Sequence, residues 1–122
     1  MASNYKQPGD TFTWTNGTGS AVVSGQLVRV GQILAVALVD IASSASGTVA
    51  CKGVFTLPKV SSAVIAQGDS LLWDASAAAF DAKSATPATG DVTGPPAVAF
   101  EAAGNGVTSF RVRLTGVPGT VT

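Results

Sequence analysis

The chain has 122 residues, enough for a single domain with a buried core, and its 7 basic and 7 acidic side chains leave no net charge. Only 11% of the residues are charged and the basic ones are scattered, which argues against nucleic acid as a partner. The longest apolar run, residues 33–39, is far shorter than the roughly 20 residues of a membrane-spanning helix, so we expect no membrane segment.

Residues 1–10 are polar and end in a Pro-Gly-Asp turn signal, so we expect an extended N-terminal arm without a secretory signal. Residues 11–15 then alternate strictly between polar and apolar, which predicts a half-buried strand. Phe12 and Trp14 would share one face of it.

The next stretch predicts a turn followed by more strands. Asn16-Gly17 favours a type I′ hairpin turn, and in the absence of a secretory signal we interpret the glycosylation pattern at Asn16 in the same way. Residues 21–23 and 27–30 are short strand candidates. Residues 33–39 are apolar on both faces, which predicts a central strand.

The middle of the chain predicts one long strand and one helical turn. Residues 49–57 alternate, with Cys51 on the apolar side, and Pro58 should end the strand. Residues 61–67 are the only plausible helical turn, with a serine to cap it and Gly68 to terminate it.

The C-terminal part predicts two hairpins separated by a loop. Residues 70–74 and a strand opening at Phe80 form the first, and 83–96 form a long surface loop rich in proline and glycine. In the last hairpin, 97–102 and 107–115, Arg111 and Arg113 should point outward.

These elements predict an all-β protein. Valine occurs 16 times against 7 leucines, and threonine is frequent, as is typical of strands. We expect a small barrel or sandwich of about 7–10 short strands with at most one helical turn, as a single domain over 11–122 behind the 1–10 arm. A surface so short of charge favours contact with other subunits.

The sequence gives little support for catalysis or for cofactor binding. The chain has no histidine and one cysteine, so it cannot build a histidine-dependent nucleophile or a zinc site, and no phosphate-binding loop is present. We therefore expect no enzyme activity, metal, cofactor or small-molecule substrate. A minor hydrolase using Asp69 and Asp74 is an alternative, although aspartate at such positions usually stabilises turns.

Four side chains remain as candidate contact residues. Trp14, together with Trp73, could stack on a sugar in a carbohydrate-binding or adhesive β-sandwich module, although both sit at positions typical of core or interface packing. Arg111 and Arg113 could contact an acidic partner, or they could form a solvated face that pairs across the hairpin with Glu101.

Four segments resemble the capsid cement (decoration) proteins of tailed phages, in the family's order. They are NYKQPGD at 4–10, GVFTLPK at 53–59, QGD followed by LWD within 67–74, and VRLTG at 112–116. Residues 83–96 depart from the pattern, being longer and richer in proline and threonine.

The resemblance implies a structural protein that binds the outside of an icosahedral head and reinforces the shell. Its expected partners are two further copies, as a trimer at three-fold or quasi-three-fold positions, and the major capsid protein. Its expected location is the outer surface of the virion, after synthesis in the bacterial host cytoplasm. The family has no catalytic residues, and its N-terminal segment often reaches neighbouring capsid subunits. This implies contact roles for Tyr5, Lys6, Gln7, Pro8 and Trp14.

Overall fold

A computed structural model describes residues 9–122, and all regular structure in this range is β, as the sequence predicts. Its strands form three antiparallel sheets packed together, consistent with a small sandwich or barrel. Residues 9–122 hold eleven strands, more than the predicted 7–10, because several are only two or three residues long.

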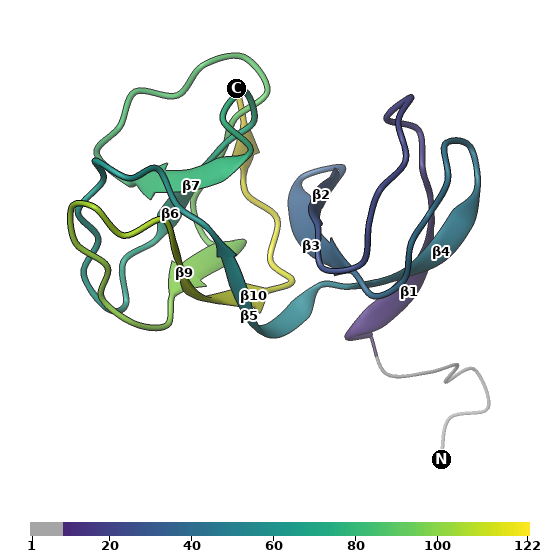
Figure 1. Cartoon of the computed structure of the whole chain (residues 1–122), viewed down its shortest axis with the longest axis horizontal. Coiled ribbons are helices and arrows are strands. Elements are labelled where there is room, and N and C mark those ends of the chain that lie inside the picture. The colour runs from purple at the N-terminus through teal and green to yellow at the C-terminus, as the bar shows by residue number, and fades with distance from the viewer. Residues whose placement is uncertain (1–8) are drawn as a thin grey trace.

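The first sheet is built from residues 11–50 and forms the right-hand half of the view in Figure 1. Its spatial order is β1-β4-β3-β2, with bounds β1 (Thr11–Thr15), β2 (Leu27–Val30), β3 (Ile33–Ala37) and β4 (Ser46–Ala50). The predicted strand 11–15 is therefore confirmed. Phe12 and Trp14 lie opposite Val49 and Gly47 of β4 and are half-buried.

The remaining chain forms a three-stranded sheet, β5-β10-β9, and a four-stranded sheet, β11-β8-β6-β7. Their bounds are β5 (Lys52–Pro58), β6 (Leu71–Asp74), β7 (Ala79–Ala82), β8 (Val92–Thr93), β9 (Ala97–Ala99), β10 (Ser109–Thr115) and β11 (Thr120–Val121). Both predicted hairpins are present, as β6–β7 and β9–β10.

The central strand β3 of the first sheet is buried on both faces, which explains its apolar sequence. Along β3, Leu34 and Val36 belong to a C-terminal core, while Ala35 and Ala37 belong to an N-terminal core. Successive side chains of a strand point to opposite faces, so one sheet supplies both cores. The predicted central strand is confirmed over Ile33–Ala37.

The prediction of one strand over residues 49–57 is wrong. The chain bends at Cys51, where β4 leaves the first sheet and β5 enters the second, crossing between the two halves in Figure 1. Gly53 has φ +129°, a conformation that residues with a Cβ rarely adopt, and its position just after the bend accounts for the glycine. The strand does end at Pro58 as predicted.

The predicted hairpin turn at Asn16-Gly17 is also wrong. β1 pairs with β4 rather than with the segment that follows it, and Asn16 is fully buried. Its side-chain amide donates to the carbonyls of Ser20, Ile41 and Ala42 at 2.7, 3.1 and 3.4 Å, and its Oδ1 accepts from Thr18. Asn16 thus ties two loops together, which explains an asparagine in a buried position.

No helical turn forms over residues 61–67. Ala63 and Ile65 are buried while Val64 is exposed, so burial alternates with the period of extended chain. The backbone of Ile65 exchanges two hydrogen bonds with Ala103, at 2.8 and 2.9 Å. This bridge outweighs the weak helical signal of the serine and glycine that flank the segment.

The expected loop 83–96 contains the short strand β8. Asp91 and Val92 within it are 3% and 1% exposed, so the segment contributes to the core despite its proline and glycine content. Asp91 accepts hydrogen bonds from the backbone amides of Ala75 and Ala88, which fixes the segment against the β6–β7 turn.

Candidate functional site

The outer face of the β5-β10-β9 sheet gathers the candidate side chains of the C-terminal hairpin. In β10, Phe110, Val112 and Leu114 are buried and Arg111 and Arg113 are exposed, as the alternation predicts. Antiparallel neighbours point to the same side of a sheet, so the register defines the rows of this face. One row is Val54–Arg113–Val98, and the next pairs Arg111 with Thr56.

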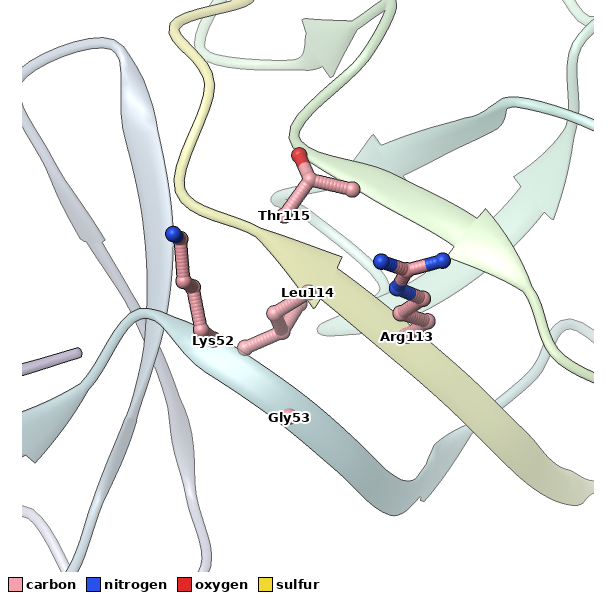
Figure 2. Close-up of a pocket in the computed structure, with 5 residues that line it drawn as sticks. All are labelled: Lys52, Gly53, Arg113, Leu114 and Thr115. Atoms are coloured by element: carbon pink, nitrogen blue, oxygen red, sulfur yellow. The ribbon is translucent and has the colours of Figure 1, made fainter.

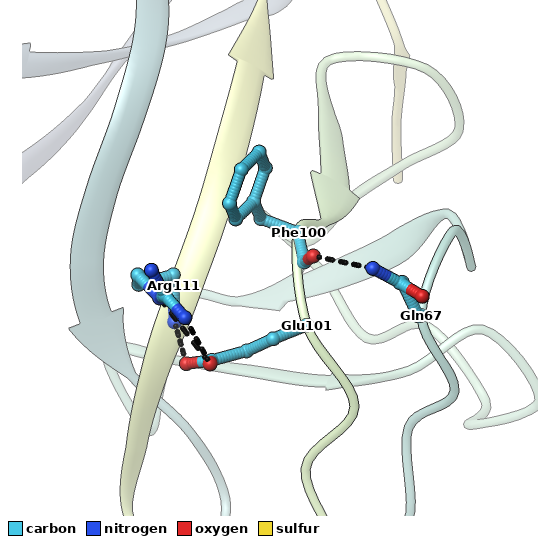
Figure 3. A network of polar contacts seen from close by, with 4 residues as sticks. All are labelled: Gln67, Phe100, Glu101 and Arg111. Atoms are coloured by element: carbon cyan, nitrogen blue, oxygen red, sulfur yellow. Dashed lines mark hydrogen bonds and ion pairs between the residues drawn. The ribbon is translucent and has the colours of Figure 1, made fainter.

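Arg111 is held in a closed polar network (Figure 3). Its Nη2 and Nε donate to Oε2 of Glu101 at 2.9 and 3.2 Å, and its backbone amide donates to Oε1 at 2.9 Å. Its guanidinium also lies 5.5 Å from the centroid of the Phe100 ring, a cation–π contact. The hydrogen bonds from the Arg111 side chain, then that from its backbone, lower the pKa of Glu101. The pairing of Arg111 with Glu101 is therefore confirmed.

Arg113 lies beside a cavity of about 320 Å³ at the end of β10. Lys52, Gly53, Leu114 and Thr115 complete the lining, and Figure 2 shows Lys52 and Arg113 on either side of the strand end. The Lys52 ammonium is 3.8 Å from the Asp10 carboxylate, and both side chains are mostly exposed. Pairing between such exposed groups is weak, so the site keeps a positive character.

The two tryptophans do not form a common groove. Trp73 is 8% exposed in the C-terminal core, with its ring edge-to-face with Phe80 at 5.0 Å. Trp14 packs half-buried against the N-terminal core. A carbohydrate-binding module with both rings on one stacking surface is therefore not what this fold provides.

The aspartates proposed for a hydrolase serve turns instead. Asp69 accepts from the backbone of Ala66 and from Lys83, and these bonds lower its pKa. Asp74 accepts from the hydroxyl of Ser76 and the backbone of Ala77, which lowers its pKa. Within residues 9–122 no cluster of three potential metal ligands occurs, and Cys51 is buried as expected for a structural thiol.

The remaining predicted contact residues, Tyr5, Lys6, Gln7 and Pro8, lie outside the described residues. Two lysines with clear roles were not singled out by the sequence. Lys52 joins the Arg113 cavity through the β5–β10 register. Lys59 is 4% exposed and donates to three backbone carbonyls, of Val60, Ser61 and Val107. Only its place directly after Pro58, at the end of a strand, hinted at a structural role.

A sequence model of phage cement proteins matches residues 6–114, from the expected arm to Leu114 in β10. The chain belongs to the phage cement protein family. The match spans most of the chain and confirms the resemblance of the four segments. No curated protein sequence matches the chain.

Membership in the cement family establishes the broad role. Cement proteins are structural components of phage capsids, so this chain is a structural, capsid-associated protein of a bacteriophage. Across residues 9–122 there is no helix of the length and apolar character needed to cross a membrane. The family has no enzymatic role to assign to the aspartates described above.

Proposed function

We propose that this cement protein binds the outer surface of a mature phage head as a trimer, at three-fold or quasi-three-fold positions, and acts without any catalytic step. The observation that carries the proposal is membership in the cement family together with a surface of low charge. Closed cyclic symmetry would bury such a surface between copies.

An exposed apolar cluster supports contact between copies. Val23, Leu38 and Val39 are 58%, 42% and 47% exposed. They come from two neighbouring segments, because Ser24 donates to the carbonyl of Leu38 and Val22 exchanges backbone hydrogen bonds with Ile41. We assign this cluster to the trimer interface, since exposed apolar groups of this kind favour association.

The stabilisation follows from mass action. A ligand that binds only the mature lattice stabilises it in proportion to the logarithm of its concentration over the dissociation constant. A trimer that bridges several capsid subunits gains further from effective concentration after its first contact. The N-terminal arm, with Tyr5, Lys6, Gln7 and Pro8, and the nearby Trp14 would add contacts to neighbouring capsid subunits.

Binding to heads prepared without the protein tests the function. We expect the 12.1 kDa chain to sediment as a trimer, to occupy three-fold positions in images of decorated heads, and to raise the temperature at which heads rupture. Leu38→Asp should give monomers that bind weakly, whereas Val64→Asp, at an exposed valine of the other half, should not. Absence of binding to heads would contradict the proposal.

Deletion of residues 2–8 tests the arm. The deletion stops before Gly9 and Asp10, because their carbonyls accept hydrogen bonds from Cys51 and belong to the folded part. We expect the variant to keep its β circular dichroism spectrum and to bind heads at least about tenfold more weakly, as loss of one good contact implies. Unchanged occupancy would remove the arm from the contact surface.

A further inference from the structure

The outer face of the β5-β10-β9 sheet carries one positive charge that no group in the described residues 9–122 balances. The side chain of Arg113 forms no hydrogen bond or ion pair with any other residue of the range 9–122. Each other cation in this range has a partner within the chain: Arg29, Lys52, Lys59, Lys83 and Arg111. Arg113 therefore differs from Arg111, which precedes it by two residues on the same face.

The described chain also offers no uncommitted carboxylate to Arg113. Every acidic side chain in residues 9–122 already accepts a hydrogen bond or an ion pair from within the chain: Asp10, Asp40, Asp69, Asp74, Asp81, Asp91 and Glu101. From residues 9–122, a second copy of the chain could offer Arg113 only a carboxylate that it would share with an internal partner. The missing carboxylate is thus more readily supplied by a different protein.

The surroundings of Arg113 suit a carboxylate side chain. Arg113 lies directly across the strands from Val54, which is 43% exposed, and from half-buried Val98. Contact with a partner would exclude water from these apolar neighbours and strengthen a charged hydrogen bond. Lys52 also lines the cavity of about 320 Å³ beside Arg113 (Figure 2). A planar guanidinium binds carboxylates with two parallel hydrogen bonds.

We propose that Arg113, Lys52 and the cavity that they line form the docking site for an aspartate or glutamate side chain of the capsid subunit. The inference rests on the proposed function and adds the part of the surface, and the chemistry of the partner, that make the contact. A nucleic acid is not the occupant, because two cations on an otherwise balanced face cannot follow a phosphate backbone.

Head binding by Arg113→Gln tests the site. The substitution removes the charge and keeps a polar side chain, and since Arg113 has no partner within residues 9–122, the melting temperature should not change. We expect at least about tenfold weaker binding to heads prepared without the protein, with a smaller salt dependence than the unsubstituted protein. Arg29→Gln is the matched control, because Arg29 is exposed on β2 and bonds only to the carbonyl of Gly31. It should bind normally.

Zero-length carbodiimide cross-linking of decorated heads identifies the partner. The reagent joins an amine to a carboxylate, so Lys52, and the new amine in Arg113→Lys, should become linked to an acidic residue of the capsid subunit. A link to a second copy of this chain would overturn the inference, as would Arg113→Gln binding equal to that of the unsubstituted protein. Neither result would contradict the proposal that this protein binds phage heads. Failure of the unsubstituted protein to bind heads would instead overturn the proposed function.

Discussion

The two halves of the molecule have cores made of different side chains, and both cores include residues of the first sheet. The N-terminal core consists of small aliphatic side chains and Cys51, with Phe12 and Trp14 packed half-buried against it. The C-terminal core contains Trp73, Phe80 and Phe110, whose rings meet edge-to-face with Phe80 in the centre, at 5.0 and 6.4 Å. Aromatic side chains bury the most area, so the C-terminal half contributes more to stability.

The N-terminal core is the weaker one, and it depends more on a buried polar side chain that joins loops, which we call a polar lock. Asn16 joins the loops around Thr18 and Ile41 through bonds from both ends of its amide. The C-terminal half has a counterpart in Lys59, whose ammonium ties Val107 to the segment after β5. In each half a buried side chain adds hydrogen bonds to loop carbonyls. Loops, as well as sheets, therefore hold this fold together.

Phe80→Ala should have the largest effect on stability. The ring is 0% exposed and contacts two other rings, so we expect a loss of about 3–5 kcal/mol in the free energy of unfolding. Ile41→Ala in the N-terminal core should cost less, about 2–3 kcal/mol, because fewer atoms are removed. Urea unfolding followed by circular dichroism measures both.

The same experiment tests whether the halves unfold together. Because β2 and β3 supply side chains to both cores, each variant should lower the midpoint of a single transition. Val64→Ala, at a valine 68% exposed, should change stability by less than about 0.5 kcal/mol. Two separate transitions, or a greater loss from Ile41→Ala, would contradict the comparison.

Asn16→Ala and Lys59→Met compare the two polar locks. Each removes several hydrogen bonds that a buried side chain donates to loop carbonyls, and we expect a loss of about 1–3 kcal/mol from each in thermal or urea unfolding. The loss from Asn16→Ala should be a larger share of the stability of its own half than the loss from Lys59→Met. Protection of amides from hydrogen exchange should fall only around Thr18 and Ile41. Ser43→Ala, an exposed neighbour without such bonds, is the control. Equal loss of protection throughout would show that the lock is not local.

The sequence predicted strands where periodicity was strong and failed where tertiary contacts decide. The strand 11–15 and the inward face of β10 follow from alternation alone. The bend at Cys51 and the burial of Asn16 could not be predicted, because both depend on pairing with residues distant in sequence. Local preference therefore yields to tertiary context in both places.

The sequence predicted that both arginines of β10 point outward, but not that one of them would be paired with a carboxylate and the other not. Arg111 and Arg113 have the same local pattern, and only the position of Glu101 after β9 separates a balanced charge from an unbalanced one. The approach of Lys52 depends on the register of β5 with β10, which sequence spacing does not fix.

Lowering the pH should destabilise the C-terminal half more than the N-terminal half, and this is the smallest of the expected effects. The carboxylates with lowered pKa values, Asp69, Asp74 and Glu101, all lie in the C-terminal half. A lowered pKa means that the folded state holds the ionised form more strongly than the unfolded chain does. The resulting stability is fully present above the unfolded pKa, near pH 4, and is lost as pH falls through the folded values. The groups are exposed, so solvent screening keeps the effect small.

Glu101→Gln is the variant that isolates this effect. It keeps the shape of the side chain but not its charge, so its stability should match that of the unsubstituted protein at about pH 2 and fall slightly below it at pH 7. Thermal unfolding at both pH values measures the difference, with Asp40→Asn in the N-terminal half as the control. Because the Glu101 bonds also orient Arg111 beside Phe100, the variant should free a second guanidinium on the face that carries Arg113. Tighter head binding by Glu101→Gln would then follow from the added positive charge, and weaker binding would show that the Arg111 network itself belongs to the contact.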